Sequence, residues 1–257
     1  MRILGVRLDP LTPEAALELI EERLCAEAGE LTIVSTINAE CLALASQDHA
    51  YHEVLNQASL NLADGVGVTI AARLRGGRLH RLQGSRLVYE IAALCSSRGK
   101  RLFLLGAGPR SARLACERLR ALYDGLEVES YSPAFGASIQ KAEQSKIEER
   151  LRDFAPQALC VALGMPRQEM WIYQCRSVLA GAGVRVVVGV GGAVDYVAGS
   201  VRQPPSWVRN AGLEWLHRLA LQPRLRWRRQ LTRLPRFAAL AGLEAVRLRF
   251  RRTDGEE

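Results

Sequence analysis

The stretch VRVVVGVG (184–191) is apolar at nearly every position and rich in valine, so it predicts a strand that is buried on both faces. The stretch ALCVALG (158–164) has the same character. Apolar runs of this length without strict alternation are typical of parallel strands that helices cover on both sides. These two segments therefore place the chain in the α/β class.

Four further segments predict strands of the same kind: LTIVST (31–36), LNLAD (60–64), RLFLLG (101–106) and LEVESY (126–131). Helical patterns occupy the intervals, at residues 13–27, 38–57, 85–98, 109–123, 138–153 and 168–180. This alternation predicts an α/β fold with a Rossmann-like, mainly parallel sheet covered by helices on both faces. Ligand-binding residues in such sheets gather where strands end and helices begin.

The positive charge of the chain is concentrated at its C-terminal end. The formal net charge is +8, and residues 202–257 hold 13 of the 35 basic residues but five of the 27 acidic ones, so this segment carries the whole excess. All 13 of these basic residues are arginine. We therefore predict two parts, an α/β core at residues 1–202 and a basic helical appendage at residues 203–257.

The appendage has the composition of a surface-binding helix. Pro223 and Pro235 predict a division into short helices, because proline is tolerated at a helix start. Trp227, Leu231 and Leu234 form an apolar stripe among arginines, which favours an amphipathic helix on an anionic membrane surface. Binding to nucleic acid and simple docking of a solvated helix on the core are the alternatives, and we expect no nucleic-acid partner.

The remaining composition bears on location and cofactors. No run approaches the roughly 18 apolar residues of a spanning helix, and the N-terminus lacks the apolar core of a signal peptide. We therefore expect a cytoplasmic protein that is peripheral on the inner face of the cell membrane. The six cysteines and four histidines show no metal-binding spacing, so we expect free thiols, no metal and no cofactor. The sequence leaves the oligomeric state open, with a homo-oligomer as one alternative.

Polar clusters follow several of the predicted strands. STINAE (35–40) supplies the hydroxyl of Thr36 and the amide of Asn38, although Asn38 can also serve only as a helix cap. LADGVGV (62–68) places Asp64 at a strand end, where Asp-Gly is also a common turn. A carboxylate at this edge can accept a proton from an attacking hydroxyl.

Three glycine-containing clusters complete the set. LLGAGPRSARLA (104–115) reads G-x-G-x-x-S between a strand and a helix, which suits a phosphate but departs from the dinucleotide pattern at Ser111. VGVGGAVDYVAGSVRQPP (188–205) allows either a close backbone approach to a ligand or a loop before the appendage. LGMPRQEMW (163–171) can hold a polyhydroxylated or phosphorylated substrate through an amide and an arginine.

In their order along the chain, five motifs resemble those of the WecG/TagA/CpsF family of bacterial glycosyltransferases, glycosyltransferase family 26. They are T-x-N (36–38), DG-x-G (64–67), G-x-PRQE-x-W (164–171), VG-x-GGA-x-D (188–195) and LEWL-x-RL (213–219). The resemblance covers about residues 3–235. Five motifs in sequence are more specific than any one of them.

The resemblance implies an inverting hexosyltransferase that needs no cofactor. The expected substrates are a UDP-sugar donor, with N-acetylmannosamine, a related hexose or a uronate, and an acceptor N-acetylglucosamine on undecaprenyl diphosphate. The product enters teichoic acid or another surface polysaccharide. Asp64 is the implied general base, Thr36 and Asn38 line the sugar pocket, and Arg81 or Gln168 stabilises the leaving diphosphate.

Weaker expectations concern the nucleotide and the lipid. The candidates for nucleotide contact are Gly106, Gly108, Gly164, Arg167, Gly191, Gly192 and Asp195. Arginines of the appendage suit a lipid diphosphate because guanidinium binds phosphate in a bidentate manner, and Arg218, Arg224 and Arg228 are the candidates. The appendage is also expected to close over the pocket and exclude water.

Two departures from the family pattern bear on specificity. Many relatives read ER-x-TG where this chain has HRLQG (80–84). The departure places Gln83 in the expected pocket region, and it leaves the identity of the donor sugar open. They read EPRR where this chain has QPRL (222–225), so Leu225 replaces an expected cation.

Two other functions remain as alternatives. GAGPRS (106–111) is compatible with an NAD(P)-type oxidoreductase, in which Asp64→Asn has no effect. A non-catalytic scaffold that places its basic tail on lipid or RNA tolerates replacement of Thr36, Asp64 and Gln168.

Overall fold

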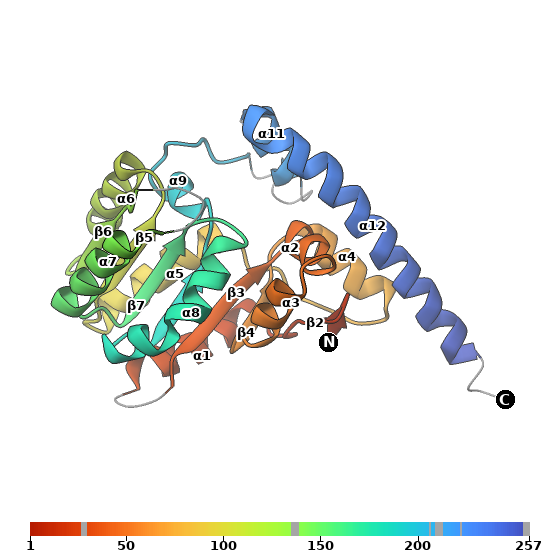
Figure 1. Ribbon diagram of the computed structural model, residues 1–257, viewed down its shortest axis with the longest axis horizontal. Helices are drawn as coiled ribbons and strands as arrows, with labels where there is room; N and C mark the ends of the chain where they lie inside the picture. Colours follow the sequence, from red (N-terminus) through yellow and green to blue (C-terminus); the bar gives the residue numbers. More distant parts are fainter. Residues whose placement is uncertain (27–29, 135–138, 206, 209–212, 222, 254–257) are drawn as a thin grey trace.

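A six-stranded parallel sheet forms the centre of the protein (Figure 1). The computed structural model describes the chain except residues 27–29, 135–138, 206, 209–212, 222 and 254–257. The strands are β3 (Thr32–Ile37), β4 (Leu60–Ala63), β5 (Leu102–Gly106), β6 (Val128–Tyr131), β7 (Ala158–Ala162) and β8 (Val186–Gly189). Their order is β4-β3-β8-β7-β5-β6, and every neighbouring pair is parallel.

Successive strand residues point to opposite faces of the sheet, and each face has its own apolar cluster. Leu102 and Leu104 pack on one side, and Phe103 and Leu105 pack on the other. The helices on the first face are α1 (Pro13–Cys25), α5 (Gly84–Ser97), α6 (Pro109–Leu122) and α9 (Ala193–Val197). Those on the second face are α7 (Lys141–Phe154) and α8 (Arg167–Gly181). The predicted α/β fold is thereby confirmed.

A third apolar cluster lies at the ends of β3 and β4, where it includes Ile37 and Ala63. Its elements are the hairpin of β1 (Arg2–Ile3) and β2 (Val6–Arg7), and the helices α2 (Ala39–Ala45), α3 (His49–Asn56), α4 (Val66–Leu74) and α12 (Pro223–Thr253). This cluster forms a wall beside the carboxyl ends of the sheet, and the walls of the functional site come partly from it.

The structure differs from the predicted helices in several places. The predicted helix at 38–57 is two helices, because Asp48 accepts a hydrogen bond from the N–H of Tyr51 at 3.0 Å and caps a new start. Helix α4 was not predicted. Its sequence VGVTIAARL begins with valine and glycine, and this start was interpreted as part of a turn that follows a strand. The short helix α9 occupies part of the stretch that was read as an irregular loop.

Among the described residues, the appendage contains the helices α11 (Glu214–Leu221) and α12, and the predicted division at Pro235 was wrong (Figure 1). Helix α12 begins at Pro223 as expected but continues through Pro235. An interior proline costs about 3 kcal/mol. Burial of Phe237, Ala241 and Ala245 against the core offsets that cost.

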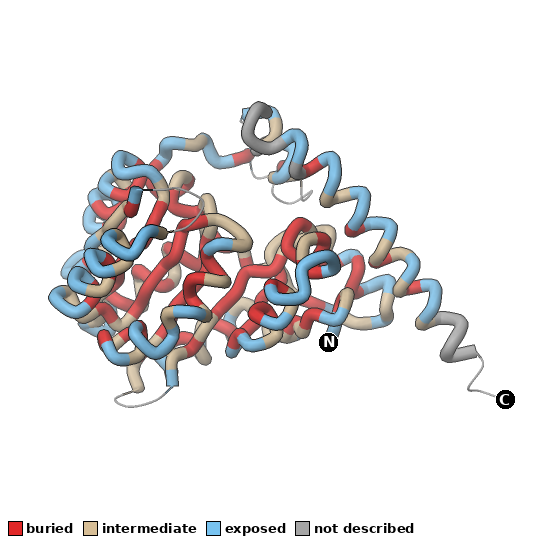
Figure 2. Tube along the Cα trace, viewed as in Figure 1, coloured by how far each residue is buried: buried red, intermediate tan, exposed pale blue. Residues whose placement is uncertain are grey.

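Along α12, side chains that pack on the core alternate with side chains that are exposed to solvent. In Figure 2 buried positions recur along α12 between exposed turns. Arg75 at the end of α4 forms an ion pair with Glu244, and the same carboxylate accepts the N–H of Leu4 at 3.0 Å. The helix therefore packs on the core over its middle section, while the boundary at residue 202 stays a prediction. No helix in the described ranges is long and apolar enough to cross a bilayer.

Candidate active site

A cavity of about 580 Å³ opens at the carboxyl edge of the sheet. Its lining includes residues that follow β3, β4, β7 and β8, together with residues from α4, α11 and α12. A site of this size holds a substantial small-molecule ligand. Seven of the predicted site residues line it together: Thr36, Asn38, Asp64, Gly164, Gln168, Gly191 and Gly192.

Thr36 and Asn38 are placed by the end of β3. The hydroxyl of Thr36 donates to the carbonyl of Gly189 at 3.0 Å, which joins the ends of β3 and β8. The side-chain oxygen of Asn38 accepts the N–H of Cys41 at 3.0 Å and caps α2. The capping role of Asn38 is therefore present, and its amide nitrogen is the group that remains for a ligand.

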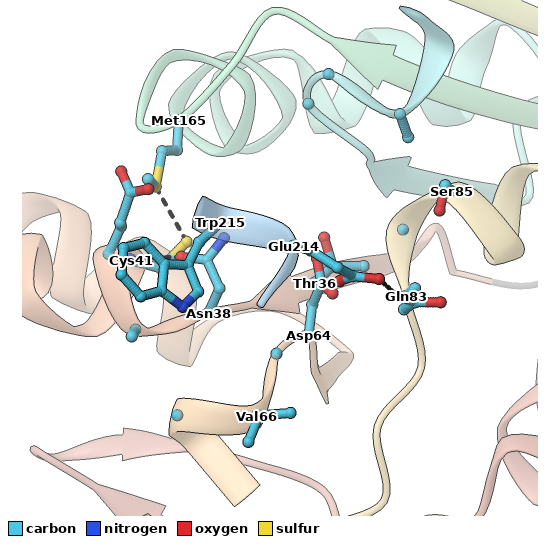
Figure 3. Close-up of a pocket in the computed structure, with 18 of the residues that line it drawn as sticks. Thr36, Asn38, Cys41, Asp64, Val66, Gln83, Ser85, Met165, Glu214 and Trp215 are labelled. Atoms are coloured by element: carbon cyan, nitrogen blue, oxygen red, sulfur yellow. Dashed lines mark hydrogen bonds between the residues drawn. The ribbon is translucent and has the colours of Figure 1, made fainter. Parts of the chain in front are cut away.

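Asp64 follows β4 on the same side of the cavity as Thr36 (Figure 3). Its N–H donates to the carbonyl of Ile37 at 2.7 Å, and Gly65 takes φ 117° to turn the chain into α4. That φ favours glycine, because a side chain is strained there. The turn holds the Asp64 backbone firmly at the edge of the sheet.

A short extended segment brings Arg81 beside the end of the strand that leads to Asp64. Ala63 and Arg81 form a parallel β-bridge, and the N–H of Leu82 donates to the carbonyl of Ala63 at 3.0 Å. The chain then continues through Gln83 into α5. Arg81 and Gln83 therefore lie next to the strand that carries Asp64, although they are distant from it in sequence.

Gln168 is buried, and both ends of its side-chain amide have protein partners. The carbonyl oxygen accepts the N–H of Gly191 at 2.9 Å, and the nitrogen donates to Glu169 at 2.7 Å. A Cβ at Gly189 would lie 2.9 Å from the Gln168 nitrogen, so glycine is needed there for close approach. One amide hydrogen of Gln168 remains to face a ligand.

Glu169 is a residue that the sequence reasoning did not assign. Burial raises the pKa of its carboxyl, and the hydrogen bond from Gln168 and the neighbouring Tyr51 hydroxyl oppose that rise in part. The neighbouring thiol and phenol also stay un-ionised at neutral pH. Burial raises the pKa of the Cys41 thiol to about 12 and that of Tyr51 well above its usual value. Glu169 fixes the orientation of Gln168 from behind the cavity.

Substitution of Glu169 by glutamine is expected to change how stability depends on pH. The carboxyl titrates near 4.5 when unfolded and at a higher pH when folded, so the folded state holds a proton that the unfolded state has lost. Wild-type stability should fall relative to Glu169→Gln as pH rises through the folded pKa, by about 1.4 kcal/mol for each unit of difference. Urea unfolding between about pH 4.5 and 8.5 measures this, and a relative gain for wild type on raising pH would contradict it.

Glu214 reaches the cavity from the appendage and was also not assigned. Its carboxylate accepts a hydrogen bond from the Gln83 amide nitrogen (Figure 3). The same carboxylate lies 3.4 Å from a terminal nitrogen of Arg81. Trp215, the next residue, lines the cavity too, and its carbonyl accepts from Gln230 of α12 at 3.3 Å. Contacts between residues more than 130 positions apart leave no signal in a single sequence.

Other predicted residues do not line this cavity in the part of the chain that the structure describes. Gly106 is the last residue of β5 and Gly108 lies just beyond it; β7 and β8 separate β5 from β3 by three strand intervals, roughly 14 Å. Arg167, Asp195 and the exposed Arg228 are also not among the lining residues. The side chains of Arg218 and Arg224 lie outside the described residues.

The geometry of Gly106 has a packing explanation. Its φ is 99°, and a Cβ there would lie 2.7 Å from the carbonyl oxygen of Ala162 on β7. The glycine is therefore required by the close approach of two strands. The stretch GAGPRS does not need a phosphate ligand to account for this residue.

The cavity thus combines an acid, a hydroxyl and amide groups at one sheet edge, beside helices of the third apolar cluster. Such a set can bind a polar ligand and transfer a proton. A carboxylate at Asp64 can accept a proton from a hydroxyl, while Thr36, Asn38 and Gln168 position the ligand around it.

Comparison with known proteins agrees with the motifs. Residues 1–252 match the profile described as "Glycosyl transferase WecG/TagA/CpsF family". The chain is 31% identical over 207 residues to an N-acetylglucosaminyldiphosphoundecaprenol N-acetyl-beta-D-mannosaminyltransferase of Bacillus subtilis (strain 168), covering 80% of this chain and 77% of that protein.

Two further relatives carry the same name. The protein of Bacillus spizizenii (strain ATCC 23059 / NRRL B-14472 / W23) is 32% identical over 205 residues, 79% of this chain and 76% of the relative. That of Staphylococcus aureus (strain NCTC 8325 / PS 47) is 29% identical over 228 residues, 88% of this chain and 85% of the relative. The family match spans nearly the whole chain, and the chain therefore belongs to the WecG/TagA/CpsF family of glycosyltransferases.

Proposed function

We propose that this glycosyltransferase moves N-acetylmannosamine from a UDP donor to N-acetylglucosaminyldiphosphoundecaprenol. The observation that carries the proposal is the position of Asp64, which lines one cavity with Thr36, Asn38 and Gln168. The relatives named above support the choice of sugar and acceptor, because their printed name contains both.

The proposed reaction is a single displacement with Asp64 as general base. The acceptor hydroxyl oxygen attacks the anomeric carbon of the donor sugar, and a new carbon–oxygen bond forms. The bond from that carbon to the β-phosphate oxygen breaks, and UDP leaves with the electron pair. The proton of the acceptor hydroxyl passes to the carboxylate of Asp64. The single displacement inverts the anomeric configuration.

The appendage supports a lipid-linked acceptor. Its exposed large apolar side chains include Trp207, Trp215, Leu216, Leu221, Trp227 and Leu231. Arg228 lies over the ring of Trp227, with its guanidinium carbon 5.2 Å from the ring centroid. Large apolar side chains beside arginines suit the interface of an anionic membrane. We place the protein on the inner face of the membrane.

The role of the arginines follows from the chemistry of the acceptor. A lipid diphosphate concentrates negative charge at the interface, and Arg228 is exposed on the same turn as Trp227. We assign Arg218, Arg224 and Arg228 to this diphosphate. Helix α11 then covers the donor end of the cavity through Glu214 and Trp215.

A panel of UDP-sugars tests the proposal directly. The full chain is mixed with vesicles that contain the lipid-linked N-acetylglucosamine acceptor, and UDP release and extension of the lipid are measured. UDP-N-acetylmannosamine is expected to give the highest kcat/KM, and release of UDP without the acceptor should be much slower. Reduction of NAD(P) with no sugar transfer would instead favour the oxidoreductase alternative.

A further inference from the structure

One wall of the cavity is apolar and open to water. Ile70 of α4 lines the cavity, yet its side chain is 47% exposed. Leu234 and Phe237 of α12 line the same cavity. A sugar nucleotide is polar over most of its surface, so a large aliphatic side chain left exposed at a ligand site points to a ligand that is partly apolar.

The apolar surface continues out of the cavity along α4. Leu74 lies one turn beyond Ile70 and is also 47% exposed, but it is not among the described residues that line the cavity. Side chains at positions i and i+4 of a helix lie on the same face, and the exposed Arg73 is on this side of the helix too. Ile70 and Leu74 therefore form a short apolar strip, the α4 track, that begins in the cavity and ends on the protein surface.

Helix α12 runs beside the α4 track (Figure 1). A Cβ at Gly67 would lie 3.5 Å from a ring carbon of Phe237, and Arg75 forms an ion pair with Glu244. These contacts precede and follow the track in the sequence of α4, so the two helices stay together along its length. Helix α12 also carries the exposed apolar side chains of the proposed membrane contact. The track therefore leads from the cavity along the helix that is expected to meet the bilayer.

We propose that the α4 track binds the first isoprene units of the lipid acceptor, those next to the diphosphate. This inference rests on the proposed function, because the lipid belongs to the same acceptor. Asp64 lies two residues before α4, and Ile70 and Leu74 lie about 6 Å and 12 Å along the helix axis from its first residue. A sugar with its diphosphate has a comparable length, so the reacting hydroxyl can face Asp64 while the lipid begins at the track.

The residue types favour an isoprenoid over the uracil ring of the donor. Uracil is flat and carries hydrogen-bonding groups, and aromatic side chains offer the best surface for stacking on a base. Ile70 and Leu74 present branched aliphatic side chains without polar atoms. Such side chains match a branched hydrocarbon, which gains free energy by leaving water and needs no hydrogen bonds.

The expected effect follows from the apolar area that the lipid covers. Each methylene group that leaves water changes a binding equilibrium by about fourfold. Serine at both positions removes most of the apolar surface of the track, so Ile70→Ser/Leu74→Ser should lower kcat/KM for a prenyl-linked acceptor by at least about tenfold. An acceptor whose diphosphate carries only a methyl group does not reach the track, so its kcat/KM should stay the same.

The experiment uses soluble acceptors without vesicles, so that membrane affinity does not contribute. N-acetylglucosaminyl diphosphate is linked either to methyl or to geranyl, and kcat/KM is measured with UDP-N-acetylmannosamine for the full chain. Wild type should prefer the geranyl acceptor by at least about tenfold, and the double variant should lose most of that preference. Leu74→Ser alone leaves the cavity lining intact and should lose part of it. Val178→Ser is the matched control, because Val178 is 40% exposed on α8 and is not among the described lining residues.

Equilibrium binding separates this inference from the proposed function. Calorimetry without donor gives the dissociation constants of both acceptors, so the preference is measured even when no transfer occurs. Absence of transfer by wild type from any UDP-sugar would overturn the proposed function. Equal affinity of wild type for the methyl and geranyl acceptors, or a preference that the double variant retains, would overturn the role of the α4 track.

Two further measurements identify the occupant of the track. The affinity for UDP should be the same in wild type and the double variant, and a loss as large as that for the geranyl acceptor would assign Ile70 to the nucleotide and overturn the proposal. Sedimentation with phosphatidylglycerol vesicles that contain no acceptor forms the second arm. Weaker vesicle binding by a double variant that keeps its geranyl preference would make α4 a general membrane contact, which also contradicts the proposal.

Discussion

Replacement of Asp64 by asparagine is expected to lower kcat for sugar transfer by about 10²- to 10⁴-fold, the range associated with loss of a general base. Asparagine keeps the size of the side chain but cannot accept the proton of the acceptor hydroxyl. The affinity for UDP should change little, since the backbone of Asp64 is held by the hydrogen bond to Ile37. UDP release and calorimetric binding of UDP measure the two quantities.

The control for this variant is Asp153→Asn, because Asp153 is exposed on α7 and lies away from the cavity. It should transfer sugar at the wild-type rate. A fully active Asp64→Asn enzyme would refute the assignment of the base. Glu40 and Glu214 would then be the next candidates, because they are the other acids in the described lining of the cavity.

The double variant Trp227→Ser/Leu231→Ser is expected to weaken binding to anionic vesicles by about 100-fold or more. Both side chains are exposed on α12, at 46% and 63% of their surface. Burial of a large apolar side chain contributes about 1.5–3 kcal/mol, so loss of two corresponds to about 3 kcal/mol at least. Sedimentation with phosphatidylglycerol vesicles measures the binding, and activity on long-chain acceptors should fall in parallel.

Leu122→Ser is the control for the vesicle experiment, because Leu122 is 61% exposed on α6, outside the appendage. Vesicle binding that survives the double variant would exclude this face of α12 as the membrane contact. Point variants are preferable to deletion of residues 203–257, because Phe237 and Ala241 of α12 belong to the third apolar cluster. Deletion would expose that cluster and confuse loss of binding with loss of stability.

The sheet could be predicted from the sequence because its signal is local. The segments 158–164 and 184–191 are continuous apolar runs, and the structure has β7 and β8 within them. The edge of the sheet where Thr36, Asp64 and Gln168 meet also followed, because parallel strands share one carboxyl edge. The spacing of apolar residues and the residue types that favour turns were sufficient to predict the sheet and the edge at which the site lies.

The missed features depend on contacts between distant parts of the chain. Helix α12 is continuous because its middle packs on the core, and a proline within the sequence predicts the opposite. Glu214 reaches Gln83 and Arg81 only once α11 has been placed over the cavity. The glycine turn after β5 resembles a phosphate-binding turn, but the close approach of β5 to β7 accounts for Gly106, and neither Gly106 nor Gly108 is among the described lining residues.

The continuity of α12 also sets a distance. Trp227 lies in the proposed membrane contact and Phe237 lines the cavity, and both belong to the same helix. Gln230 and Leu234 of this helix line the cavity as well, so the cavity begins only about 5 Å along the helix axis from Trp227. Under the proposed function, a single rigid helix therefore carries both the membrane contact and part of the cavity wall, which keeps the reacting sugar close to the lipid diphosphate.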